Sequence, residues 1–195
     1  MADPQERPSR ETAIKAAVRD ILETALLTLV IFLSVRLAVQ NFRVEGFSME
    51  PTMHTNEYLL VNKVTYMVGQ PQRGDIIVLR FPLDPRRDFI KRIIGLPGEQ
   101  VEVRNGSVYV DGRALVEPYI RQPPAYTYPR VTMPPRQYFV LGDNRNNSDD
   151  SHVWNGLPKE YIIGKAWVSY WPPATWGIVS HDDVRYAADS VVPAA

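Results

Sequence analysis

The sequence predicts a mainly β, antiparallel domain that follows a single N-terminal transmembrane helix. Residues 21–39 read ILETALLTLVIFLSVRLAV, an apolar run close to the ~20 residues that cross a bilayer. The rest of the chain consists of short runs rich in Val, Ile and Tyr, and its 17 prolines argue against a helical bundle. We therefore expect a cytoplasmic segment (1–20), the membrane helix (21–39) and an extracytoplasmic β-rich domain (40–195) with a peripheral tail from 181 onward.

Charges at both ends of the apolar run predict its orientation. Four basic residues precede it: Arg7, Arg10, Lys15 and Arg19. Arg43 is the only Lys or Arg among residues 40–56, so the positive-inside rule places the N-terminus in the cytoplasm. Glu23 and Arg36 interrupt the run near its ends, where long side chains can reach the interface. A helix of a soluble protein and a cleaved signal peptide remain alternatives.

Strand signals follow one another along the β-rich region. Apolar runs predict strands at 57–64, 75–81, 89–94, 137–141 and 162–170. Asn105-Gly106 lies between VEVR and SVYV and predicts a type I′ hairpin, and Asp111-Gly112 marks the next turn. The proline-rich residues 117–136 predict a long irregular excursion.

The composition excludes several classes of protein. Lys plus Arg and Asp plus Glu are 22 each, so the net charge of zero argues against nucleic-acid binding through bulk positive charge. The absence of cysteine excludes disulfides, a cysteine nucleophile and thiolate metal sites. There is no P-loop, and the three histidines lack metal-ligand spacing. We expect no metal and no cofactor.

Three segments combine apolar and reactive side chains: 47–53 (FSMEPTM), 89–98 (FIKRIIGLPG) and 142–152 (GDNRNNSDDSH). In a strand over residues 89–94, side chains alternate, so Lys91 and Arg92 point to opposite faces. An apolar strand with a cation on each face must pair, solvate or perturb these charges.

These segments resemble the type I signal peptidases, membrane-anchored serine endopeptidases that use a Ser–Lys dyad. The resemblance covers residues 48–53, 73–82 (RGDIIVLRFP), 91–98 and 142–151, in the same order. It implies removal of N-terminal signal peptides from exported preproteins at the plasma membrane, with the cut after a small-x-small (Ala-x-Ala) motif. It further implies that the partners are signal peptides emerging from the secretion machinery and the lipid bilayer, and we expect a monomer.

The resemblance makes Ser48 the nucleophile and Lys91 the general base. A serine hydroxyl needs a base that removes its proton as it attacks a carbonyl group. Lysine serves as a base only when neutral, and its ordinary pKa is about 10.4. Burial beside Phe89 and Ile93 would lower the pKa of Lys91, because desolvation disfavours the ammonium.

The polar loop that follows residue 141 is expected to support the dyad. By the resemblance, Ser148 hydrogen-bonds and orients the lysine, and Asp150 holds that network. Asp143 and Arg145 are expected to be structural. Our hypothesis is that Asp143 pairs with Arg92 and so fixes the strand beside the lysine.

The oxyanion and substrate sites are expected around the nucleophile, at Gly46, Phe47, Met49 and Pro51. The Ser48 N–H is the natural oxyanion donor. Some relatives carry a serine where this chain has Gly46, so the second donor stays open.

Two histidines leave further alternatives. His152 stands where many members of the family have arginine, which would make an ion pair with Asp150 pH-dependent. A triad of Ser48 with His54 or His152 is a rival to the dyad. A narrow-specificity relative of the same family and a non-catalytic membrane-tethered β scaffold are rival functions.

Overall fold

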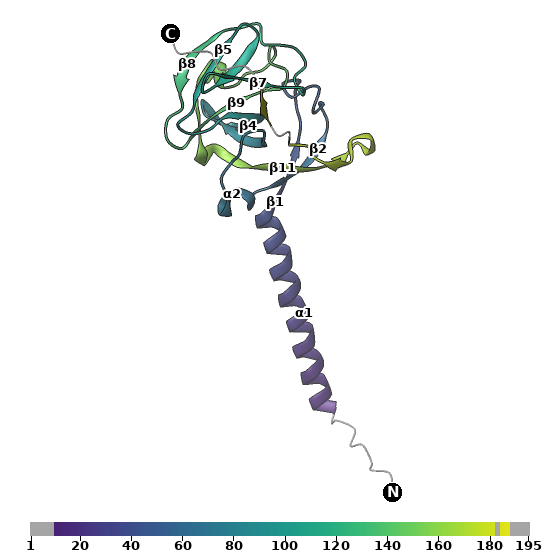
Figure 1. Ribbon diagram of the computed structural model, residues 1–195. Helices are drawn as coiled ribbons and strands as arrows, with labels where there is room; N and C mark the ends of the chain where they lie inside the picture. Colours follow the sequence, from purple (N-terminus) through teal and green to yellow (C-terminus); the bar gives the residue numbers. More distant parts are fainter. Residues whose placement is uncertain (1–9, 182–183, 188–195) are drawn as a thin grey trace. The chain divides into compact units, whose positions relative to one another are not determined.

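The computed structural model describes residues 10–181 and 184–187, which fall into an N-terminal helical unit and a β-rich unit (Figure 1). Helix α1 (Arg10–Ala38) contains a 25-residue stretch that is long and apolar enough to cross a membrane. The helix begins at Arg10, well before the predicted residue 21. In these additional turns, Lys15 pairs with Glu11 across one turn at 2.7 Å. The predicted boundary at residue 39 lies one residue inside the first strand. Residues 1–9 of the predicted cytoplasmic segment lie outside the described residues.

The β-rich unit contains two antiparallel sheets, which confirms the predicted fold class. The larger sheet has the order β1-β2-β11-β3-β4-β9-β10, with β12 paired to β11, and the smaller has the order β13-β7-β6-β5-β8. Figure 1 shows β5 and β8 at one end of this unit and β2 and β11 at the other.

The strands are β1 (Val39–Arg43), β2 (Tyr58–Asn62), β3 (Ile76–Phe81), β4 (Asp84–Gly95), β5 (Gln100–Arg104), β6 (Ser107–Val110), β7 (Arg113–Val116), β8 (Tyr128–Thr132), β9 (Gln137–Leu141), β10 (Leu157–Pro158), β11 (Ile162–Trp171), β12 (Gly177–Ile178) and β13 (Arg185–Tyr186). Short helices are α2 (Thr65–Val68), α3 (Ser151–Trp154), η1 (Lys159–Tyr161) and η2 (Pro173–Thr175).

The predicted hairpin is present between β5 and β6. Asn105 and Gly106 have φ angles of 50° and 72°, the positive values that a type I′ turn requires. Asp111 and Gly112 repeat this pattern at 51° and 76° between β6 and β7. Local turn chemistry therefore sets the register of the smaller sheet.

Strand β4 contributes side chains to all three hydrophobic clusters of the core. Ile90, Ile93 and Ile94 are at most 4% exposed, and each belongs to a different one of three hydrophobic clusters. The strand pairs with β3 up to Arg92 and with β9 from Arg92 to Gly95. The side chains of residues 90–94 on β4 are consequently held by packing on several sides.

The C-terminal residues that the structure describes contact both sheets. The ring of His181 accepts a hydrogen bond from the Ile76 N–H at 3.0 Å, and β13 pairs with β7. These contacts join residues that are distant in sequence, so no local sequence pattern predicts them. Residues 182–183 and 188–195 of the predicted tail lie outside the described residues.

Candidate active site

The loop of residues 46–53 carries Ser48 and is anchored by two buried methionines. Met49 and Met53 are 1% and 2% exposed, and both belong to the core cluster that contains side chains of β2. The Met53 N–H donates to the Met49 carbonyl oxygen at 2.9 Å. The backbone around Ser48 is therefore fixed by the core, while Ser48 itself is half-buried.

Strand β4 directs Lys91 at the serine. Lys91 Nζ donates to Ser48 Oγ at 2.7 Å, across 43 residues of sequence. Lys91 is 3% exposed, and its Nζ lies 5.2 Å from the centroid of the Phe89 ring. Burial lowers the pKa of Lys91 to about 8, although the carboxylate of Asp150 favours the charged form. Burial therefore acts on the pKa of Lys91 in the direction that the sequence predicted.

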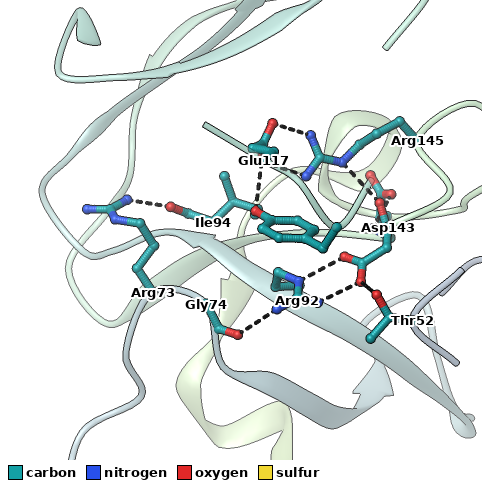
Figure 2. A network of polar contacts seen from close by, with 11 residues as sticks. Thr52, Arg73, Gly74, Arg92, Ile94, Glu117, Asp143 and Arg145 are labelled. Carbon is teal, nitrogen blue, oxygen red and sulfur yellow. Dashed lines mark hydrogen bonds and ion pairs between the residues drawn. The ribbon is translucent and has the colours of Figure 1, made fainter. Parts of the chain in front are cut away.

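Arg92 points to the opposite face of β4 and is fully buried. Its Nε and Nη2 donate to the two carboxylate oxygens of Asp143 at 2.9 and 2.7 Å, and its Nη1 donates to the Gly74 carbonyl oxygen at 3.1 Å (Figure 2). The predicted pairing of Asp143 with Arg92 is confirmed. This bidentate geometry fixes the planar guanidinium, and with it the strand next to Lys91.

Asp143 also binds the loop of residues 46–53, which carries Ser48. Thr52 Oγ1 donates to Asp143 Oδ2 at 2.5 Å (Figure 2). The next residue, Asn144, donates from its backbone N–H to the Ser48 carbonyl oxygen at 2.9 Å and from its side chain to the Phe47 carbonyl oxygen at 3.0 Å. Thr52 and Asn144 were not among the predicted site residues. Both lie inside the recognised motifs, and only the contact between distant segments identifies their role.

Asp150 organises the loop that follows β9. One of its carboxylate oxygens accepts from the Gly142 N–H at 2.9 Å, and the other lies 2.6 Å from His152 Nδ1. The contact expected between His152 and Asp150 is therefore present. Ser148 Oγ is buried and has no hydrogen bond to any residue that the structure describes. The predicted hydrogen bond from Ser148 to Lys91 is absent among the described residues, and the Ser148 hydroxyl lies beside Gly142.

Arg145 has the structural position that the sequence predicted. It is 1% exposed, and its two terminal nitrogens donate to the carboxylate of Glu117 at 2.8 and 2.6 Å. Its Nε donates to the Gly142 carbonyl oxygen at 3.1 Å. Glu117 was missed by the sequence reasoning, since it lies in the segment predicted to be irregular.

A cavity of about 480 Å³ opens beside Ser48 and Lys91. Gly46 and Phe47 line it, as their predicted substrate-binding role requires, and Phe47 is 56% exposed. Gly46 has a φ angle of 89°, in the left-handed region that favours glycine.

Met49 and Pro51 were also predicted at the substrate site, but neither lines this cavity. Met49 is instead a core anchor, and Pro51 is exposed outside the cavity. Within the described ranges, the Ser48 N–H has no hydrogen-bond acceptor and is free to bind an oxyanion.

Neither candidate histidine contacts Ser48. The side chain of His54 is 59% exposed and lies 3.7 Å from Glu50, whereas His152 contacts Asp150 and stacks on Tyr126. The rival Ser–His arrangement is therefore not assembled. Over residues 10–181 and 184–187, no three His, Asp or Glu side chains gather in a metal-binding group.

Comparison with known proteins finds a matching family and several similar relatives. Residues 18–171 match the family model described as signal peptidase, peptidase S26. The chain is 42% identical over 174 residues to the probable signal peptidase I-2 of Synechocystis, covering 86% of this chain and 79% of the relative. It is 40% identical to the signal peptidase I of Leptolyngbya laminosa, covering 87% and 89%. A crystal structure of a signal peptidase I from Enterococcus faecalis matches with a TM-score of 0.44 at 34% identity, covering 50% of this chain and 97% of that chain.

Proposed function

The chain belongs to the signal peptidase family, peptidase S26, and from this membership we propose that it is a serine endopeptidase that removes N-terminal signal peptides from exported preproteins. One observation carries the assignment of the reacting groups. Lys91 Nζ lies 2.7 Å from Ser48 Oγ in a cavity of about 480 Å³. A buried amine of lowered pKa beside a hydroxyl group is the arrangement that activates a serine nucleophile.

In the proposed reaction, neutral Lys91 takes the hydroxyl proton of Ser48 as Oγ attacks the carbonyl carbon of the scissile bond. The carbonyl oxygen becomes an oxyanion, and the Ser48 N–H donates to it. When this intermediate collapses, the C–N bond breaks and the Lys91 ammonium gives its proton to the leaving amine. The mature protein departs, and the signal peptide remains as an ester on Ser48.

Water then hydrolyses the ester. Lys91 accepts a proton from the attacking water, the bond from the carbonyl carbon to Oγ breaks, and Lys91 returns the proton to Ser48. The buried pair of Arg92 and Asp143, to which Thr52 also bonds, keeps Lys91 on β4 and Ser48 on its loop at a fixed relative position during the reaction. Asp150 holds the backbone of the neighbouring polar loop and stabilises the charged form of Lys91.

Among the described strands, none pairs with one edge of β4 over residues 88–91, and this edge supports an extended substrate. Residues 88–91 of β4 pair with β3 on one side, whereas β9 pairs only from Arg92 to Gly95 on the other. Residues 88–91 also line the cavity. An extended peptide can add to this edge, and every second side chain then points to the same face. We infer that small residues at the first and third positions before the cut, as in Ala-x-Ala, occupy the cavity.

The apolar helix and the family support a membrane-anchored enzyme. We propose one crossing of the plasma membrane with the N-terminus in the cytoplasm, because the basic residues lie before the span. Trp171 and Trp176 are 53% and 66% exposed, so they do not close the core. Their exposure supports a place in the lipid interface, where tryptophan is enriched.

Cleavage of a preprotein whose signal peptide ends in Ala-x-Ala, by the purified full chain in detergent, tests this function. The wild type should cut after the second alanine, with the product masses read by mass spectrometry. Folded Ser48→Ala and Lys91→Ala variants should be inactive. Full activity of the Lys91→Ala variant would exclude Lys91 as the base, and an inactive wild type would favour the scaffold function.

A further inference from the structure

The segment of residues 117–126, here called the brace, contacts the polar loop, Arg92 of β4 and the turn that carries Ser48. Its Glu117 pairs with buried Arg145, and the ring of Tyr119 lies 3.9 Å from the guanidinium carbon of Arg92. Near its end, the Ala125 N–H donates to Asn146 Oδ1 at 2.7 Å. The sequence predicted only an irregular excursion here, whereas the structure shows a segment bonded along its length to the polar loop.

Arg121 is the residue of the brace that reaches the nucleophile loop. Its Nη1 donates to Glu50 Oε2 at 2.5 Å, across 71 residues of sequence. Glu50 is two residues from Ser48, and its N–H bonds the Phe47 carbonyl oxygen at 3.3 Å. Glu50 therefore belongs to the turn that carries Ser48, so the ion pair between Arg121 and Glu50 holds that turn in place.

The backbone of Arg121 contacts the other half of the site. Its N–H donates to the Asp143 carbonyl oxygen at 3.2 Å. Asp143 is the partner of Arg92, the immediate neighbour of Lys91 on β4. One residue of the brace thus links the turn of the serine, through its side chain, to the strand of the lysine, through its backbone.

We propose that the brace positions the reacting pair and that Arg121 is its positioning residue for Ser48. This inference rests on the proposed function. Arg121 touches neither Ser48 nor Lys91 and acts on the serine through Glu50. Small displacements of a nucleophile lower the rate of reaction steeply, whereas exposed ion pairs contribute little to stability.

Arg121→Ala is the informative variant, because its side chain is 55% exposed and its ion pair is at the surface. Arg130→Ala is a matched control. Arg130 is 46% exposed and pairs with Glu102, whose side chain is 19% exposed, as is that of Glu50. We expect Arg121→Ala to lower kcat about tenfold with KM nearly unchanged. Arg130→Ala should leave both unchanged, and both variants should melt at the wild-type temperature.

Acylation by a small serine-directed reagent separates positioning from substrate binding. Such a reagent reacts at Ser48 without the flanking residues of a peptide. A positioning role predicts that Arg121→Ala slows acylation about as much as peptide cleavage, and that Arg121→Lys restores part of the rate. If acylation keeps its wild-type rate while peptide cleavage falls, Arg121 binds substrate and the inference is wrong.

A double variant tests the route through Glu50. Glu50→Gln should reproduce the loss seen for Arg121→Ala, and combining the two should add little. If the losses of activity of the two single variants add in the double variant, this route is excluded. If Arg121→Ala melts below the Arg130→Ala control, the loss of activity reflects impaired folding and the inference is wrong. If the wild type cleaves preprotein and Arg121→Ala matches it, only this inference fails. If the wild type cleaves nothing, the proposed function fails first.

Discussion

Replacing Lys91 by methionine should abolish activity and stabilise the fold. Burial lowers the pKa of Lys91 from 10.5 to about 8, and one pKa unit corresponds to about 1.4 kcal/mol. Keeping the ammonium charged in the folded state at neutral pH therefore costs about 3 kcal/mol. Methionine fills a similar volume without charge, and the lost hydrogen bond to Ser48 offsets about 1 kcal/mol. The net gain of about 2 kcal/mol raises the melting temperature by roughly 4–8 °C.

The gain in stability of the Lys91→Met variant over the wild type must also depend on pH. Because the folded-state pKa of Lys91 is depressed, the unfolded chain binds the proton more readily between about pH 8 and pH 10.5. The destabilisation of the wild type is complete below this window and disappears above it. Thermal unfolding of the full chain in detergent, followed by near-UV circular dichroism, should show a large difference near neutral pH that shrinks toward pH 10.5.

Lys165→Met provides the control. Lys165 Nζ pairs with the buried carboxylate of Asp75 at 2.5 Å, so its loss leaves an uncompensated charge and should destabilise the protein. If Lys91→Met melts at or below the wild-type temperature at neutral pH, or if its gain is independent of pH, the reasoning about the buried lysine is refuted.

Three further variants test the surroundings of the dyad. Gly142→Ala should lose activity and about 1–3 kcal/mol of unfolding free energy, because the added Cβ would clash with the Ser48 carbonyl oxygen; unchanged cleavage and denaturant unfolding would contradict this. Asp149→Asn removes an exposed charge that raises the pKa of Lys91, so the midpoint of the pH–rate profile should move to lower pH and not to higher pH. Asp143→Asn breaks a fully buried ion pair and should lower the free energy of unfolding, measured with urea, by on the order of 3–5 kcal/mol. A variant with wild-type stability and activity would show that the pair is dispensable.

Local signals made the strands, and the face of β4 on which Lys91 lies, predictable. Asn105-Gly106 specifies its turn by backbone chemistry alone, and the alternation of residues 89–94 places Lys91 and Arg92 on opposite faces. The resemblance supplied the roles of both Ser48 and Lys91, because no local pattern distinguishes Ser48 from a turn serine or Lys91 from an ordinary strand lysine. The hydrogen bond between the two reacting groups is what the structure adds.

The brace shows what such signals miss. Its ion pairs join Glu117 to a residue 28 positions away and Arg121 to one 71 positions away, and its own sequence has no periodicity. Met49 and Pro51 were assigned to the substrate site because they adjoin the nucleophile in sequence. The direction of a turn decides which neighbours face the cavity, and the sequence does not encode that direction locally.

The dependence of kcat/KM on pH tests the central claim most directly, since it reports the ionisation of the free enzyme. With Lys91 as the base, kcat/KM should rise about tenfold per pH unit from about pH 6 and level off above a single midpoint near pH 8. A midpoint near pH 6.5, the ordinary pKa of histidine, would transfer the role of base to a histidine. A profile without a rise over this range would contradict a titrating base altogether.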